Sequence, residues 1–159
     1  MADTNEMALA KTVYADLCAA LDKRKWSYKK HDEELVITFS VSGDDIPMEF
    51  MLIIDAERQL LQVLSKLPFA VPEDKRVDLA IATCVVSNHL ADGSFDFDIK
   101  SGAIIFRMTS CFRGSKIGDG LFEYLVFCSA ATVDDYNDTF FAISKGMMGV
   151  DDLIKKIQG

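Results

Sequence analysis

Hydrophobic residues change their spacing along the chain, and these changes limit the possible folds. Between residues 35 and 70, apolar residues recur at every second position in three runs, which start near Leu35, Met48 and Leu61. This alternation is typical of half-buried strands. The connections between the runs are short and polar, and short connections cannot return a parallel strand. The segment therefore predicts an antiparallel meander, with a shorter strand around residues 26–30 beside its first strand.

A second alternating region follows later in the chain. Phe95 to Ile99 and Ile104 to Phe112 alternate apolar and polar residues, and Ser101-Gly102 provides a turn between them. This pattern predicts a β-hairpin with one apolar face and one solvated face. Asp96 and Arg107 fall on the solvated face, where we expect an exposed cross-strand ion pair of little energetic weight.

Helical spacing separates and flanks these strands. The predicted helices span about 4–23, 72–91, 119–140 and 151–158. Asp3 and Glu6 form a capping-box pattern at the first start, and Pro72 supplies a residue that favours the start of the second. Asp92-Gly93 is typical of a helix end. Helices combined with an antiparallel meander and hairpin predict an α+β fold, in which the helices cover one face of the sheet.

The second predicted helix carries an apolar stripe that we assign to the core. Its members recur at helical spacing: Val77, Ala80, Ile81, Cys84, Val85 and Asn88. On a buried face an unpaired Asn88 amide would cost roughly 1 to 3 kcal/mol, so it needs hydrogen-bond partners. We expect the turn at 92–95 to supply them; the alternative is a role for Asn88 in binding or at an interface.

The third predicted helix has more apolar surface than one sheet face covers. One stripe contains Phe122, Leu125, Val126 and Val133. The second stripe contains Leu121, Tyr124, Phe127 and Cys128. Large apolar patches are uncommon on soluble monomers, and twofold pairing is the commonest way to cover them. The second stripe is therefore a candidate interface, and we expect a homodimer.

Composition limits the class of protein further. With 159 residues, half of them hydrophobic and 26% charged, the chain is expected to form a single domain over residues 1–159. A net charge of −8 disfavours nucleic acid and anionic membrane surfaces as partners. The four separated cysteines are expected to be reduced, and the first seven residues lack the pattern of a secretory signal. We therefore expect a cytoplasmic protein.

No residue pattern indicates catalysis. The two histidines, His31 and His89, lie far apart, which excludes a histidine-rich metal site. The Gly114–Gly120 segment lacks the order of a phosphate-binding loop, and no Ser, Cys or Lys has an evident catalytic partner. We expect no catalytic residues, no cofactor and no metal, and thus not an enzyme.

Three local runs carry a resemblance to a known family. They are residues 72–76 (Pro-Glu-Asp-Lys-Arg), residues 88–98 (Asn-His-Leu-Ala-Asp-Gly-Ser-Phe-Asp-Phe-Asp) and residues 104–107 (Ile-Ile-Phe-Arg). Over roughly residues 5 to 145 the chain resembles the YbjN-like family, whose fold is similar to that of class I type III secretion chaperones. The family is loosely described as sensory transduction regulators. The resemblance implies this fold, dimerisation and protein binding, and it implies no reaction.

The sequence therefore favours a non-catalytic protein-binding module, chaperone-like or regulatory, that acts as a dimer and binds a protein partner not identified by the sequence. The alternative is a small-ligand sensor domain with a pocket between sheet and helices. A pocket lined by apolar groups and converging polar groups would favour the sensor, whereas an exposed apolar patch would favour the protein-binding module.

Overall fold

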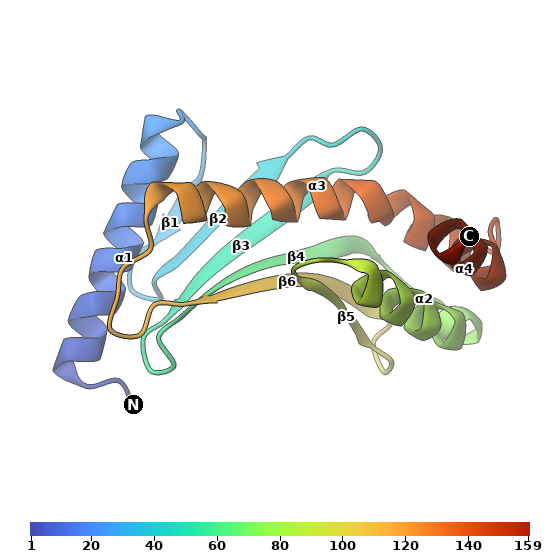
Figure 1. Cartoon of the computed structure of the whole chain (residues 1–159), viewed down its shortest axis with the longest axis horizontal. Helices are drawn as coiled ribbons and strands as arrows, with labels where there is room; N and C mark the ends of the chain where they lie inside the picture. The colour runs from blue at the N-terminus through green and yellow to red at the C-terminus, as the bar shows by residue number, and fades with distance from the viewer.

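A computed structural model describes all residues from Met1 to Gly159. The chain folds into one six-stranded antiparallel sheet and four helices (Figure 1). The strands are β1 (Lys29–His31), β2 (Val36–Val41), β3 (Met48–Asp55), β4 (Leu60–Ala70), β5 (Ser94–Asp98) and β6 (Ala103–Cys111). The helices are α1 (Thr4–Lys23), α2 (Arg76–His89), α3 (Asp119–Ser144) and α4 (Val150–Gln158).

The sheet joins the predicted meander to the predicted hairpin. Its strand order is β1-β2-β3-β4-β6-β5, and every neighbouring pair is antiparallel. The meander is confirmed, with β1 as the expected short first strand. The predicted run that starts near Leu61 forms the longest strand, β4, which pairs with β3 on one side and with β6 on the other. Strand β5 and strand β1 are the two free edges.

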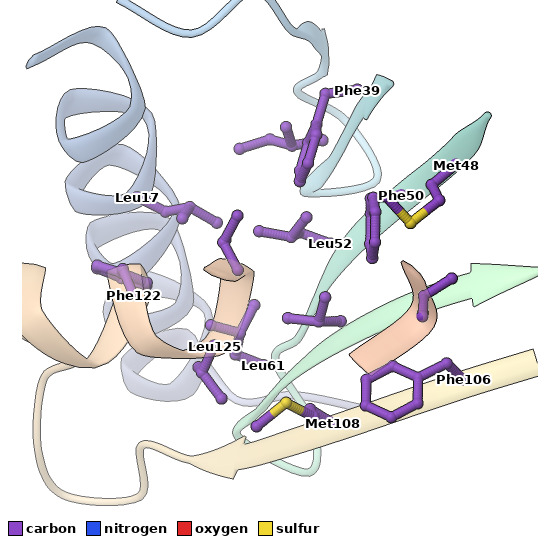
Figure 2. Close-up of a cluster of buried hydrophobic side chains, with 14 of the residues drawn as sticks. Leu17, Phe39, Met48, Phe50, Leu52, Leu61, Phe106, Met108, Phe122 and Leu125 are labelled. Atoms are coloured by element: carbon purple, nitrogen blue, oxygen red, sulfur yellow. The ribbon is translucent and has the colours of Figure 1, made fainter. Parts of the chain in front are cut away.

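The helices lie on one face of the sheet, and the core fills the space between them. Helix α3 runs along the sheet, with α1 across its first turns and α2 and α4 near its far end (Figure 1). Alternate residues of the strands point toward the helices and are buried. Figure 2 shows Phe50 and Leu52 from β3 with Phe106 and Met108 from β6, facing Leu17 of α1. These residues belong to one contiguous cluster, as expected for a single core.

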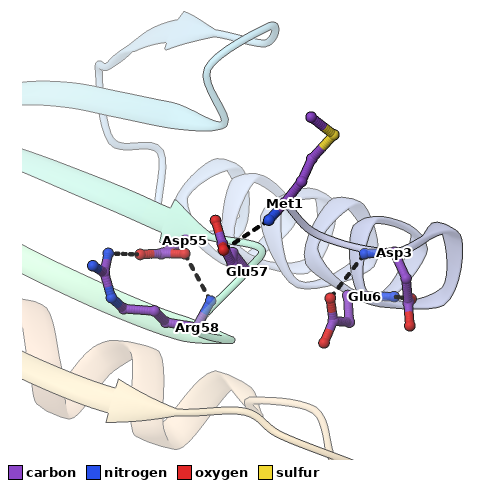
Figure 3. Close-up of polar contacts among 6 residues, drawn as sticks. All are labelled: Met1, Asp3, Glu6, Asp55, Glu57 and Arg58. Atoms are coloured by element: carbon purple, nitrogen blue, oxygen red, sulfur yellow. Dashed lines mark hydrogen bonds and ion pairs between the residues drawn. The ribbon is translucent and has the colours of Figure 1, made fainter.

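Polar contacts hold the start of α1 beside the β3–β4 turn (Figure 3). The carboxylate of Asp3 accepts a hydrogen bond from the backbone N–H of Glu6 at 2.8 Å, and the Glu6 carboxylate accepts one from the N–H of Asp3 at 2.8 Å. This is the predicted capping box. The terminal amino group of Met1 pairs with Glu57, one turn residue of the β3–β4 connection, at 2.7 Å.

The start of the second predicted helix differs from expectation. Residues Glu73–Lys75 form a 3₁₀ turn, and the α-helix begins at Arg76, four residues after Pro72. The Arg76 guanidinium donates to the carbonyl oxygens of Val71, Ile99 and Lys100 at 2.8 to 3.3 Å. These bonds attach the start of α2 to the β5–β6 turn, which places α2 beside the β5 edge.

Candidate binding surfaces

Helix α2 packs on the sheet through a face other than the one predicted. Its buried residues are Leu79, Ala82, Thr83 and Val86. Val77 is 65% exposed and Ile81 is 42% exposed. The expectation that the Val77–Asn88 stripe faces the core is therefore wrong. Both stripes have helical spacing, and the sheet packs against the one that lies on the opposite side of the helix.

The misassigned stripe forms an outward-facing apolar surface. Ile99, in the turn after β5, is 56% exposed and lies beside it. We call this the α2 surface. It is lined only by apolar side chains and Cys84: Val77, Ala80, Ile81, Cys84, Val85 and Ile99. Apolar side chains that cluster on a helix already buried on its other face are typical of an interaction site.

A groove separates α2 from the free edge of β5. Ser87 and Phe95 are two of its lining residues, and they join the helix to the strand. The Ser87 hydroxyl accepts a hydrogen bond from the Phe95 N–H at 2.9 Å and lies 3.4 Å from the Phe95 carbonyl oxygen. The turn residues that we expected to form hydrogen bonds with Asn88 thus form them with Ser87 instead. Asn88 itself is exposed and lines the groove, so it lies at a candidate interface and has no buried amide to satisfy.

The two edges of the sheet differ in how well they are protected. Strand β1 has only three residues, and two of them are Lys29 and Lys30. Short length and lysine are devices that prevent edge-to-edge pairing. Strand β5 has five residues, no lysine, and the α2 surface next to it. The β5 edge lacks lysine, but Ser87 of α2 already binds the N–H of Phe95, so this edge too is partly closed to pairing with another chain.

The four candidate interface residues on α3 lie together on its outer side. Leu121, Tyr124 and Phe127 are exposed, and Cys128 is partly buried. The expectation that the sheet cannot cover this stripe is confirmed. The Tyr124 hydroxyl donates to the Asp92 carboxylate at 3.1 Å, and this bond, followed by a hydrogen bond with Cys128, raises the pKa of Tyr124 to about 12. The bond thus links Tyr124 of α3 to the turn that follows α2.

The start of α3 meets the end of α1 at an aromatic contact that the sequence analysis missed. Trp26 packs edge-on against Phe39 of β2 at 5.3 Å between ring centroids, and against Phe127 at 5.6 Å. The Arg24 guanidinium lies 5.7 Å from the Phe127 ring centre. A visible signal was the segment from Lys23 to His31, in which Trp26 and Tyr28 lie between two runs of basic residues.

Between the same helices lies a small apolar cavity of about 20 Å³. Its lining comes from α1, α3 and the connection after α1: Leu17, Ala20, Leu21, Arg24, Trp26, Phe122, Glu123, Val126 and Phe127. A cavity of this size holds about one water-sized group, whereas ligand pockets usually measure roughly 300 to 1,000 Å³. This cavity is too small for such a ligand; the groove between α2 and β5, at about 790 Å³, is the space between helix and sheet that bears on the sensor alternative.

Titratable groups form structural pairs. Asp96 and Arg107 form the predicted exposed ion pair, with 2.8 Å between Oδ2 and Nε. His31 lies 3.4 Å from the Thr38 hydroxyl.

All four cysteines are free, and no group of three or more His, Cys, Asp or Glu side chains is placed to hold a metal ion. None of the four helices has both the length and the apolar composition needed to cross a membrane.

Comparison with solved structures places this architecture among the type III secretion chaperone-like α+β folds, as the sequence resemblance implied. One similar structure is Escherichia coli YbjN, for which a role in transcription regulation has been suggested; it matches with a TM-score of 0.58 and 10% identity, over 82% of this chain and 90% of YbjN. Another is the HopA1–SchA chaperone–effector complex, with a TM-score of 0.54 and 16% identity, over 87% of this chain and 99% of the matched chain. No protein-family model and no curated protein sequence matches the chain. At these identities the likeness shows the shared fold.

Proposed function

We propose that the protein is a non-catalytic protein-binding module, chaperone-like or regulatory, that acts as a homodimer in the cytoplasm. The observation that carries the proposal is the α2 surface, where Val77, Ile81 and Ile99 are exposed next to one another. The fold shared with a chaperone in complex with its effector and with YbjN supports protein binding. Four free cysteines agree with a reducing compartment.

The α2 surface suits a second copy of the same chain. A twofold axis brings the same patch of both chains together, so the patch must be complementary to itself. If two α2 helices pair in antiparallel orientation, Ile81 of one chain would lie opposite Cys84 of the other. Val85 would likewise lie opposite Ala80, so that a large residue meets a small one in each case. The α3 stripe then stays free for another partner, which changes the interface expected from the sequence.

Cross-linking through Cys84 tests this arrangement. Cys84 is exposed and lies within one turn of the middle of the α2 stripe. In the proposed dimer it therefore lies near Cys84 of the other chain. We compare two variants that each retain one exposed cysteine, Cys84 or Cys111, with the other three cysteines replaced by serine. A short bis-maleimide reagent is expected to link two chains efficiently through Cys84.

Cys111 is the matched control, because it is exposed at the end of β6, away from α2. It is expected to give only the weak cross-linking produced by random collisions, which rises with protein concentration. Equal cross-linking through both cysteines, or none through Cys84, would exclude α2 as the dimer interface.

A further inference from the structure

We propose that the groove between α2 and α3, in which α4 lies, binds an amphipathic helix of a partner polypeptide, and that α4 fills it until the partner displaces α4. We call this region the α4 groove; it is formed by His89 of α2 and by Asp135, Tyr136 and Thr139 of α3. The inference rests on the proposed protein-binding function and names the kind of partner. It is separate from the α2 surface, which no residue of α4 lines.

Only apolar packing holds α4 in this groove, beside α2 and the far end of α3 (Figure 1). Leu153 is 1% exposed, and Val150 and Ile157 are partly buried against the core. These residues recur at i, i+3 and i+7, so they lie on one face of the helix. No ion pair and no hydrogen bond joins residues 150–158 to another element. Recognition in the α4 groove therefore depends on the spacing of aliphatic side chains.

The end of α3 is complete without α4. The N–H of Gly146 donates to the Ile143 carbonyl oxygen at 3.0 Å, and the N–H of Met147 donates to the Ala142 carbonyl oxygen at 2.9 Å. Gly146 has a φ of 70°, in the left-handed region. These are the features of a Schellman motif, which ends a helix through its own backbone. Movement of α4 out of the groove therefore leaves α3 intact, and residues 147–149 serve as the tether.

Helix α4 is too short to be stable once it leaves the groove. It has nine residues, and isolated helices shorter than about 12 to 15 residues are marginal in water. Gly149 precedes it and has no side chain to cap the first turn. Its acidic residues lie in the first turn and its basic residues in the last, where they favour the helix dipole. The charges of α4 thus support its own helix, and its docking depends on the aliphatic face.

The α4 groove is only partly filled. An open hollow of about 270 Å³ remains between the groove and the side chains of Leu153, Lys156 and Ile157. Side chains that border unfilled space lose contacts with the opposite wall. A longer partner helix, with larger side chains at the spacing of α4, can make contacts that α4 does not make.

The resident α4 indicates what kind of partner fits. Binding of an amphipathic helix in a groove, through anchors at i, i+3 and i+7, is a common mode of peptide recognition. The tether keeps α4 near the groove at an effective concentration on the order of millimolar, so a partner helix must compete with it. The apparent affinity for a partner is reduced by the small fraction of chains in which the groove is open. Weakening the hold of α4 is therefore expected to tighten partner binding.

Peptide binding to the full-length protein tests the proposal. One fluorescein-labelled peptide has the sequence of residues 147–159. A second keeps only the Val, Leu and Ile spacing of α4, with Ala, Lys and Glu at the other positions, and a third is a scrambled version of the second. Fluorescence anisotropy gives their affinities for wild type and two variants. Leu153→Asp disables the chain's own α4, and Lys155→Asp is the control, because it places the same side chain at an exposed position of α4.

We expect the first two peptides to bind Leu153→Asp at least tenfold more tightly than wild type or Lys155→Asp, and the scrambled peptide not to bind. Hydrogen exchange on the wild type gives a second readout. Amides of α4 are expected to exchange at least a hundredfold faster than those in the middle of α3, because α4 opens locally. Leu153→Asp is expected to remain folded and dimeric.

Equal peptide binding to Leu153→Asp and wild type, α4 amides as protected as those of α3, or unfolding of the whole domain by Leu153→Asp overturns the inference. Each of these results leaves the Cys84 cross-linking test of the proposed function unaffected. Binding of the first peptide without the second restricts the groove to the chain's own α4 and overturns the partner. Dissociation of the dimer by Leu153→Asp overturns it in favour of α4 from a second copy.

Discussion

Asp55 fixes the β3–β4 turn, and its charge makes a small contribution to stability that depends on pH. Its carboxylate accepts hydrogen bonds from the backbone N–H and from the guanidinium of Arg58, both at 2.9 Å (Figure 3). The backbone bond is the main cause of a pKa below the ordinary value of Asp55, and burial opposes it in part. A lowered pKa in the folded state means that protonation favours unfolding.

The Asp55→Asn variant keeps the backbone bond to Arg58 and loses the charge. We expect wild type to be more stable than the variant near neutral pH by less than about 1 kcal/mol. The stabilisation is fully present above the unfolded-state pKa of about 3.9 and is lost as the pH falls through the lower folded-state pKa. Urea unfolding of both proteins from pH 7 down to pH 2.5 measures the difference, and a difference that does not shrink in acid would contradict this account.

Helix α2 has one buried and one exposed apolar stripe, and a pair of substitutions distinguishes them. Val86 is fully buried against the sheet, whereas Val77 is largely exposed. Val86→Asp loses a burial worth about 1.5 to 3 kcal/mol and also strands a carboxylate in the core. We expect Val86→Asp to unfold the domain, and Val77→Asp to keep the circular dichroism spectrum of the wild type. Unfolding by Val77→Asp as complete as that by Val86→Asp would return the outward stripe to the core.

Most elements could be predicted from the sequence because their signals are local. The first helix was predicted from its capping box and spacing, and α1 has the same bounds, Thr4–Lys23. The face of α2 could not be predicted, because Leu79, Ala82 and Val86 form a second stripe with the same period as Val77 and Ile81. Only the position of the sheet decides which stripe is buried, and that is a tertiary property.

The candidate surfaces were predictable to different degrees. The exposed α3 stripe followed from an excess of apolar residues, since Phe122 and Leu125 already supply a buried face. The contact between Trp26 and Phe127 was missed, because the two residues lie far apart in the sequence.

At the scale of the whole molecule, we propose that two chains associate through the α2 surface. Sedimentation equilibrium at micromolar concentration tests this most directly, on the wild type, Ile81→Asp and Leu121→Asp. We predict twice the 17.7 kDa chain mass for wild type and Leu121→Asp, and the mass of one folded chain for Ile81→Asp. A wild-type mass that stays at 17.7 kDa as concentration rises, or dissociation by Leu121→Asp and not by Ile81→Asp, would contradict the account.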